Sequence, residues 1–247
     1  MNQIRIHTLL PLLLLAVLCT SCSRNYRVEG NSSIISLDGK VLYLKMLQDG
    51  EWVPVDSGEV IHGCFRMKGP ADSVRMVTLY MNNEALMPLV LESGKVKVSI
   101  APGSLVAQGT PLNDKLYEFI RRRNEMEQSV EELQRKEARM VLDGANIDDI
   151  HADLEKQMQD KLTEMDTYVK QFIADNYENV LDPSVFMMIC SAMPYPLMTE
   201  QVEDIMRTAP QSFKENPLVK DFLDKAKENM KLIEENKRLQ ESMAVRN

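Results

Sequence analysis

The sequence has few of the residues that carry out redox, metal-dependent or nucleophilic chemistry. Its 247 residues include four cysteines and three histidines. Cys19 and Cys22 lie in the N-terminal stretch, and the other two cysteines, Cys64 and Cys190, are far apart and lack the C-x-x-C spacing of thiol–disulfide catalysts. His62 and Cys64 could supply two ligands to a structural zinc ion, but such a site needs four. The next histidine along the chain, His151, is remote in sequence. We therefore expect no catalytic residue, no cofactor and no metal.

Positive charge and aromatic rings are also scarce. The formal net charge is −8, and aromatic residues make up 6% of the chain. A surface that binds nucleic acid needs clustered basic side chains, so we expect no nucleic-acid partner. Trp52 is the only tryptophan, which leaves little aromatic surface for stacking against sugars.

The most apolar stretch lies at the N-terminus and is short. Arg5 is followed by the apolar residues Leu9–Leu18 and then by the small pair Thr20-Ser21. This order is typical of a secretory signal peptide. Ten apolar residues are too few to span a bilayer, which needs about 20 in a helix.

The residues that lead into Cys22 resemble a bacterial lipobox, although Cys19 stands where leucine is usual. The resemblance implies that residues 1–21 are a signal peptide and that Cys22 is the lipidation site, within a tether of residues 22–25. Acyl chains would then hold the protein at the membrane. The alternative is an ordinary cleaved signal peptide with Cys22 left as a free thiol. Because Ser23-Arg24-Asn25 lacks the acidic residues of some surface-exported lipoproteins, we expect an outer-membrane anchor facing the periplasm.

Residues 26–110 are expected to form an antiparallel β-sandwich or a barrel-like domain. Val96, Val98 and Ile100 alternate with polar residues, which is typical of a strand with one buried face. Asp49-Gly50 indicates a hairpin turn, and we expect a further turn at Asp56-Ser57-Gly58. The strands predicted from β-forming residues are 40–47, 52–55, 64–68, 74–81, 86–92 and 95–100.

Six short motifs occur in an order that resembles the N-terminal β domain of unknown function of bacterial envelope lipoproteins. In those proteins the domain usually precedes a thioredoxin-like domain of the alkyl hydroperoxide reductase and thiol-specific antioxidant type. The β domain of that family has no assigned catalytic residues, so the resemblance implies none here. No C-x-x-C domain follows before Asn247, so we expect no direct oxidoreductase activity. The motifs are Tyr26-x-Val28-x-Gly30, Asp38-Gly39-Lys40-Val41-x-Tyr43-Leu44, Val55-Asp56-Ser57-Gly58, Gly63-Cys64-Phe65-Arg66-Met67-Lys68-Gly69, Leu91-Glu92-Ser93-Gly94-Lys95-Val96 and Gly109-Thr110-Pro111-Leu112-Asn113-Asp114.

Residues 111–247 are expected to form an α-helical region, which consists of a long helical hairpin and shorter helices. Apolar residues recur with helical spacing over 112–140 and again over 147–173, and Asp143-Gly144-Ala145-Asn146 separates the two patterns. Most of the 17 methionines lie at apolar seam positions with helical spacing, so we expect them to fill the core rather than to form a binding surface. The residues expected to begin the later helices are Asp182, Thr199 and Asn216.

These expectations favour a non-catalytic, lipid-anchored envelope protein that binds a partner or ligand, in thiol–disulfide or envelope maintenance. A second hypothesis is a redox-responsive protein that uses a Cys64–Cys190 pair, since an oxidising compartment permits disulfides. Two buried single thiols are the alternative for these cysteines. A third hypothesis is a surface lipoprotein that binds glycans or peptides.

Overall fold

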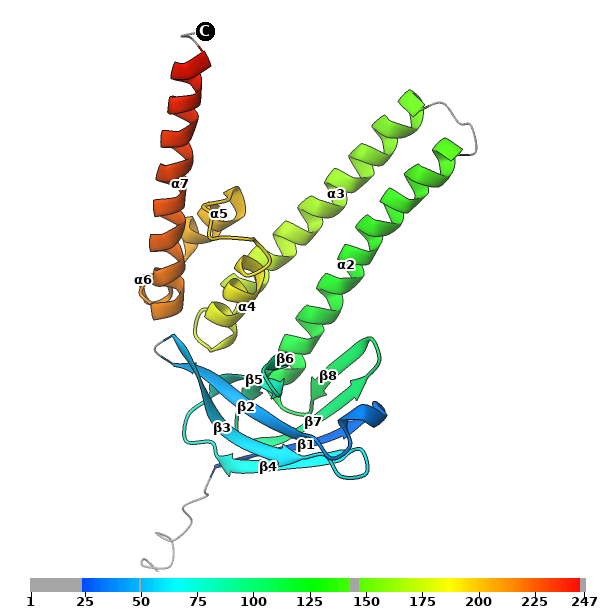
Figure 1. The fold of residues 1–247 in the computed structure, drawn as a ribbon, viewed down its shortest axis with the longest axis vertical. Coiled ribbons are helices and arrows are strands. Elements are labelled where there is room, and N and C mark those ends of the chain that lie inside the picture. Colours follow the sequence, from blue (N-terminus) through cyan, green and yellow to red (C-terminus); the bar gives the residue numbers. More distant parts are fainter. Residues whose placement is uncertain (1–23, 49, 143–146, 245–247) are drawn as a thin grey trace, which may run out of the picture. The chain divides into compact units, whose positions relative to one another are not determined.

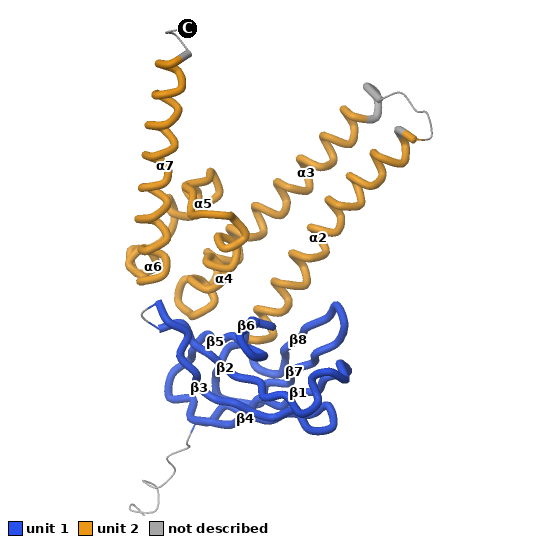
Figure 2. Tube along the Cα trace, in the orientation of Figure 1, with its two compact units in different colours: residues 1–110 blue, residues 111–247 orange. Residues whose placement is uncertain are grey.

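The structure, a computed structural model, describes residues 24–48, 50–142 and 147–244. The predicted signal peptide and Cys22 lie outside the described residues. The chain divides into two compact units, Met1–Thr110 and Pro111–Asn247 (Figure 2). We call the first the β unit and the second the helical unit.

Two four-stranded sheets make up the described part of the β unit (Figure 1). One sheet has the strand order β4-β1-β7-β8, and the other has the order β3-β2-β5-β6. The sheets form a sandwich-like arrangement and do not close into a barrel. This confirms the expected fold class, and of the two expected forms of the β domain it is the sandwich that is observed. The strands are β1 (Asn25–Ser32), β2 (Val41–Gln48), β3 (Glu51–Glu59), β4 (Cys64–Pro70), β5 (Arg75–Met81), β6 (Glu84–Leu91), β7 (Gly94–Ala101) and β8 (Ser104–Gln108), with the 3-10 turn η1 (Ile35–Leu37) after β1.

The expectation of a purely antiparallel β domain is wrong at one pair of strands. β1 and β7 pair in parallel, with Val28 opposite Val96 and Gly30 opposite Val98. The chain leaves the first sheet after β4, forms β5 and β6 in the second sheet, and returns as β7 in the direction of β1. Alternation of apolar and polar residues predicts which face of a strand is buried, but it does not encode the direction of the partner strand.

Tyr26 in β1 joins the two sheets. Its side chain is 2% exposed, and its hydroxyl donates a hydrogen bond to Asp56 Oδ2 in β3, at 2.8 Å. Burial, together with this hydrogen bond, raises the pKa of Tyr26 far above its usual range. The Tyr26 ring lies over Gly69 of β4, where a Cβ atom would come within 2.8 Å of the ring. On the same pair of strands, Phe65 lies over Gly30.

The turn expected at Asp56-Ser57-Gly58 does not form, because these residues lie inside β3. The carboxylate of Asp56 accepts hydrogen bonds from the Tyr26 hydroxyl and from the backbone N–H of Ser57. At Gly58 a Cβ atom would lie 2.7 Å from the carbonyl oxygen of Arg66 in β4. This glycine therefore permits β3 and β4 to approach closely, and it does not mark the end of a strand.

The helical unit begins with two long helices that pack against each other, as the hairpin prediction requires (Figure 1). Their connection, residues 143–146, lies outside the described residues. Thr199 begins α5 as expected, since its Oγ1 accepts a hydrogen bond from Val202 N–H, and Asn216 Oδ1 accepts one from Leu218 N–H at the start of α7. The helices are α2 (Pro111–Leu142), α3 (Ile147–Ala174), α4 (Leu181–Cys190), α5 (Glu200–Thr208), α6 (Gln211–Lys214) and α7 (Pro217–Ala244).

Asp182 does not begin α4, contrary to expectation. The helix starts at Leu181, whose N–H donates a hydrogen bond to Asn179 Oδ1 at 2.9 Å. Val180 occupies the cap position, Asn179 before it accepts the hydrogen bond of the first helical N–H, and Asp182 is the second helical residue, with a side chain 1% exposed. The sequence contains two candidate capping side chains three residues apart, and only the packing of α4 decides between them.

Within the described ranges, no helix combines the length and apolarity that crossing a bilayer requires.

Replacement of Tyr26 tests the link between the two sheets. We expect Tyr26→Phe to lower the free energy of unfolding of the β unit by about 1–2 kcal/mol, because Asp56 loses its hydrogen-bond donor. Urea denaturation followed by the fluorescence of Trp52 reports on this unit, since Trp52 is the only tryptophan. Tyr43→Phe removes an exposed hydroxyl from β2 and is the matched control. Equal losses in the two variants would contradict the role of the Tyr26 hydroxyl.

Candidate functional site

The two cysteines considered for a redox pair lie in different units, and both thiols are free. Cys64 is exposed at the start of β4, beside the tight turn at His62-Gly63. Cys190 is buried at the end of α4, and burial raises the pKa of its thiol to about 12. Thiol–disulfide exchange needs a thiolate, so the environment of Cys190 does not favour it. The Cys64–Cys190 pair remains a prediction.

Histidine and carboxylate side chains do not gather around a common point in the described ranges. No group of three or more His, Cys, Asp or Glu residues there is arranged to hold a metal ion. His62 is exposed in the turn before β4, and His151 Nδ1 lies 2.7 Å from Glu137 Oε1 on the exposed surface of α2 and α3. The candidate site must therefore be sought among apolar and aromatic side chains.

Methionine side chains are concentrated at half-buried positions of the helical unit. Only Met126 is buried among the 11 described methionines after Thr110. Met230 and Met243 in α7 are 40% and 59% exposed. The expectation that methionines fill the core is therefore wrong for this unit. The half-buried methionines are Met140, Met158, Met165, Met187, Met188, Met193, Met198 and Met206.

The arrangement of the long helices explains this exposure. α7 packs against α4 and α6, through Phe222 among other residues. Beyond Asn229 every described residue of α7 is exposed, including Leu232, Ile233 and Leu239. A position of an apolar seam is buried only where a second element covers it.

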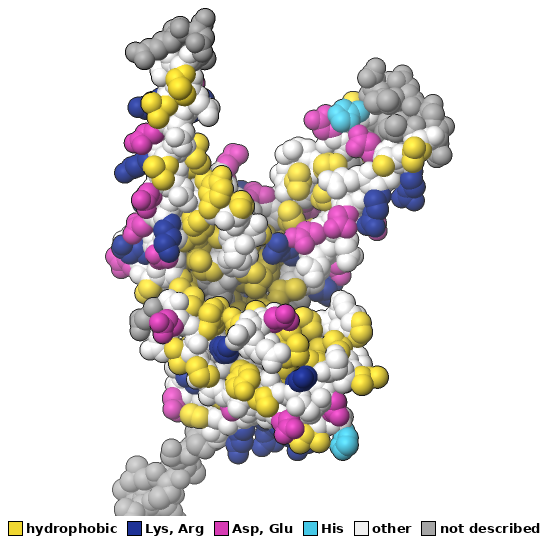
Figure 3. Space-filling model, viewed as in Figure 1, with side chains coloured by type: hydrophobic (Ala, Val, Ile, Leu, Met, Phe, Trp, Pro, Cys, Tyr) yellow, Lys and Arg dark blue, Asp and Glu magenta, His cyan; other side chains and the backbone are white. Residues whose placement is uncertain are grey.

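Several exposed or half-buried apolar side chains come from the segment between α4 and α5 and from α7. Asn229 Nδ2 in α7 donates a hydrogen bond to the carbonyl oxygen of Pro196, at 2.9 Å, so the segment lies against α7. Tyr195 beside it is 50% exposed, and Ile233, one turn further along α7, is 43% exposed. Figure 3 shows hydrophobic side chains gathered over α5 and the neighbouring part of α7. We call the following set the loop–α7 surface: Met193, Tyr195, Leu197, Met198, Met230 and Ile233.

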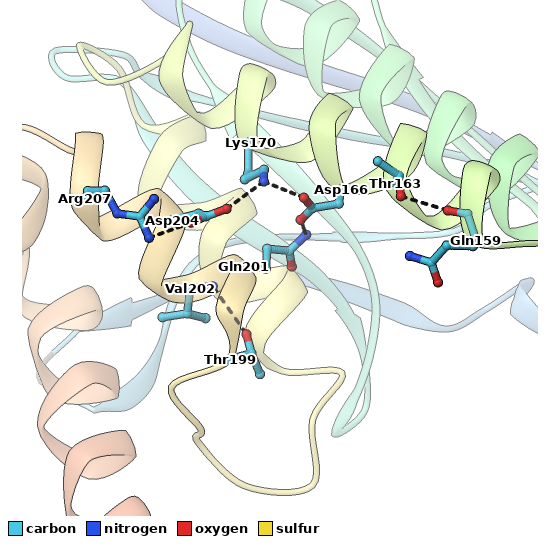
Figure 4. A network of polar contacts seen from close by, with 9 residues as sticks. All are labelled: Gln159, Thr163, Asp166, Lys170, Thr199, Gln201, Val202, Asp204 and Arg207. Atoms are coloured by element: carbon cyan, nitrogen blue, oxygen red, sulfur yellow. Dashed lines mark hydrogen bonds and ion pairs between the residues drawn. The ribbon is translucent and has the colours of Figure 1, made fainter.

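A network of charges fixes α5, and with it the end of this segment, to α3 (Figure 4). Lys170 Nζ of α3 lies 2.9 Å from Asp204 Oδ2 of α5 and 2.5 Å from Asp166 Oδ2. Gln201 Nε2 of α5 donates a hydrogen bond to Asp166 Oδ1 at 2.7 Å. Hydrogen bonds to Asp166 and Asp204 raise the pKa of Lys170, and the hydrogen bond from Lys170 lowers the pKa of Asp204. The network is largely open to solvent, so it positions α5 more than it stabilises the fold.

A second candidate surface lies on the sheet of β2, β3 and β5. The rings of Trp52 and Tyr80 meet at a centroid distance of 5.3 Å and an angle of 60°. Lys45 Nζ lies 4.6 Å from the centre of the Tyr80 ring, within the range of a cation–π interaction. Trp52 is 47% exposed and Tyr43, opposite Tyr80 in the strand register, is 36% exposed. The only tryptophan of the chain therefore belongs to an aromatic cluster in which Trp52 and Tyr43 are exposed and Tyr80 is buried.

The β unit matches a known family from Tyr26 onwards. Residues 26–116 match the family described as Domain of unknown function (DUF4369). The β unit is therefore similar to this family. This confirms the expected N-terminal domain of unknown function, and the match ends within the first turns of α2. Comparisons with curated proteins and with solved structures found no match.

Both candidate surfaces were missed in the sequence, and only the loop–α7 surface leaves a signal there. Residues 187–206, which include part of this surface, contain five of the 17 methionines. The aromatic cluster of the β unit joins three strands, and Trp52, Tyr43 and Tyr80 are separated by up to 37 residues. Their proximity follows from strand register, which the spacing of the sequence does not give.

The helical unit also contains one buried acidic group, Asp182. No described side chain or backbone group donates a hydrogen bond to its Oδ1. Burial raises the pKa of this carboxyl group to about 7. Burial disfavours the charged form of a carboxyl group and so favours the neutral, protonated form.

The raised pKa predicts a pH dependence of stability. Since the folded state binds the proton more tightly than the unfolded state, the contribution of Asp182 is complete below pH about 4 and is lost as the pH rises through about 7. Asp182→Asn cannot titrate, so the free energy of unfolding of the native chain should fall relative to the variant by on the order of 3 kcal/mol between pH 4 and pH 8.

Denaturation followed by circular dichroism at helical wavelengths measures this difference. Asp160→Asn, at an exposed position of α3, is the control and should leave the pH dependence unchanged. A constant difference between native chain and Asp182→Asn across this pH range would contradict the raised pKa.

Proposed function

We propose that this chain is a non-catalytic, lipid-anchored envelope protein that binds an apolar segment of a partner protein through the loop–α7 surface. The observation that carries the proposal is the exposure of methionine and other apolar side chains on a helical unit that is otherwise rich in charge. Contiguous exposed apolar side chains with a polar surround are typical of interaction sites. The proposed partner role belongs to the helical unit, outside the DUF4369 match.

The chemistry of the surface supports an apolar and structurally variable partner. Methionine is unbranched and polarisable, so it adapts to ligands of different shape. Tyr195 adds a large ring with a polar end, a residue type enriched in interface cores. Lys227 and Glu228 precede Met230 on α7 and are exposed, which gives the apolar set the polar rim of a protein interface.

The N-terminal sequence supports attachment to a membrane. Arg5, the apolar residues and the small pair before Cys22 have the order of a lipoprotein signal. We propose that acylated Cys22 holds the protein in the outer membrane with both units facing the periplasm. There a partner-binding surface would be available to secreted proteins and to other envelope proteins.

Photo-crosslinking in cells tests the partner surface. A benzoylphenylalanine at Met198 or Met230 should form adducts with a protein partner, because both positions lie in the loop–α7 surface. The same group at Lys156, an exposed position of α3 outside the loop–α7 surface, is the control and should form none. Failure of both surface positions, or equal adducts from Lys156, would contradict the proposal.

A charge substitution tests the apolar nature of the contact. Met230→Glu should weaken binding of the crosslinked partner by about tenfold or more, since a carboxylate would be desolvated in the interface. Lys156→Glu introduces the same side chain at an exposed position of α3 outside the surface and should change the affinity less than twofold. Dissociation constants measured with purified proteins decide between these results.

Removal of the proposed lipid site tests the anchor. Cys22→Ala should move the protein from the membrane fraction to the soluble fraction while its circular dichroism stays unchanged. Cys64→Ala is the control and should remain in the membrane fraction. Unchanged membrane retention of Cys22→Ala would refute the anchor.

The aromatic cluster favours a second candidate function, the binding of glycans or peptides by the β unit. Trp52 offers an exposed ring and Lys45 a nearby positive charge. A soluble peptidoglycan fragment should then quench or shift the fluorescence of Trp52, and Tyr43→Ala, which removes the other exposed ring of the cluster, should weaken this binding by about fivefold or more. An unchanged spectrum at millimolar concentrations of the fragment would rule out this function for the cluster.

A further inference from the structure

The helical unit contains a small cavity next to the start of α4. Its volume is about 320 Å³, at the lower end of the range for ligand sites in proteins. The walls come from the segment between α3 and α4, the first residues of α4, and the region of α6. The residues that line it are Tyr177, Glu178, Asn179, Val180, Asp182, Pro183, Ser212, Phe213 and Asn216.

Asp182 is the buried acid of this cavity. Its side chain is 1% exposed, and Oδ1 has no hydrogen-bond partner among the described residues. The neighbouring polar groups serve the backbone instead, since Asn179 Oδ1 accepts from Leu181 N–H and Ser184 Oγ donates to the carbonyl oxygen of Val180. Buried polar atoms of native proteins are nearly always paired with protein, water or ligand. A water molecule or a ligand that is not part of the described chain is therefore the expected hydrogen-bond donor to Asp182 Oδ1.

The charges around the cavity define the kind of donor. Glu178 is the other ionisable acid in the lining, and none of the lining residues is basic. Tyr177 forms a hydrogen bond with Thr208, and its pKa is raised mainly by burial and further by the nearby carboxylate of Asp182. The rings of Tyr177 and Phe213 stand 5.5 Å apart and form an apolar wall. A site with acidic and aromatic walls suits a small cation that also donates hydrogen bonds.

We propose that this cavity binds a primary ammonium group, which donates a hydrogen bond to Asp182 and rests against the rings of Tyr177 and Phe213. A protonated amine supplies three N–H donors and the positive charge that compensates the buried carboxylate. The group can come from a free small amine or from a lysine side chain of a bound peptide. The proposal does not depend on the loop–α7 surface, because none of the residues of that surface lines the cavity.

Binding of defined probes to residues 23–247 tests the proposal. n-Butylammonium represents a free amine, and the peptide acetyl-Ala-Lys-Ala-amide represents a lysine side chain. Calorimetry and the carboxyl carbon resonance of isotope-labelled aspartate measure binding at Asp182. At least one probe should bind and shift this resonance, and the probe that binds more tightly identifies the source of the amine.

Matched controls separate the ammonium group from other ligands. Acetamide, which is neutral, and tetramethylammonium, which has no N–H donor, should bind at least tenfold more weakly than n-butylammonium or the peptide. Asp182→Asn should lose at least tenfold in affinity, and Asp160→Asn should bind like the native chain. Circular dichroism verifies that Asp182→Asn is folded.

Three results would overturn the proposal. They are no binding of either amine to the native chain, equal binding of acetamide, and binding to folded Asp182→Asn within twofold of the native affinity. If Asp182→Asn does not fold, Phe213→Leu provides the second variant, because it removes the aromatic wall and keeps the apolar volume. Native affinity in Phe213→Leu, together with no shift of the Asp182 resonance, would likewise overturn the proposal.

Discussion

The helical unit depends on the packing of three phenylalanines from three helices. Phe186 of α4 is 1% exposed, and its ring meets Phe213 of α6 and Phe222 of α7 edge-on, at centroid distances of 5.5 and 5.4 Å. Edge-to-face contacts of this kind add to the hydrophobic stabilisation of the rings. The cluster sets the position of α7, against which the segment before α5 is hydrogen-bonded through Asn229. Phe213 is also a wall of the cavity at Asp182, so both proposed sites rest on this core.

The two units use their apolar residues differently. In the β unit, inward-facing residues such as Leu44 and Leu79 are fully buried between the sheets, and Tyr26 links one sheet to the other through Asp56. In the helical unit, methionines occupy positions where one neighbouring helix covers only part of the side chain. Covered leucine and valine stabilise a fold, whereas half-covered methionine leaves surface that a partner can bury. This contrast assigns partner binding to the helical unit in our proposal.

Local sequence patterns predict where strands and helices lie. Packing between residues far apart in the sequence determines how the strands pair and which side chains are exposed. The alternation at Val96, Val98 and Ile100 located β7, because one buried face is a property of the strand itself. The parallel pairing of β7 with β1 and the role of Gly58 depend on strands far apart in the sequence. Asp182 and Asn179 can both cap a helix in the sequence, but in the structure it is the side chain of Asn179 that accepts a hydrogen bond from the first N–H of α4. Methionine positions gave the helical seams correctly, but a seam does not specify how many neighbours cover it.

The central claim is that the loop–α7 surface is open to a partner. Methyl NMR of methionine-labelled protein (residues 23–247), with a soluble paramagnetic agent that broadens exposed signals, tests it directly. The structure predicts strong broadening of the Met198 and Met230 methyl signals and little broadening of Met126, which is buried in α2. Signals of Met198 and Met230 as protected as that of Met126 would show a covered surface and would contradict the account.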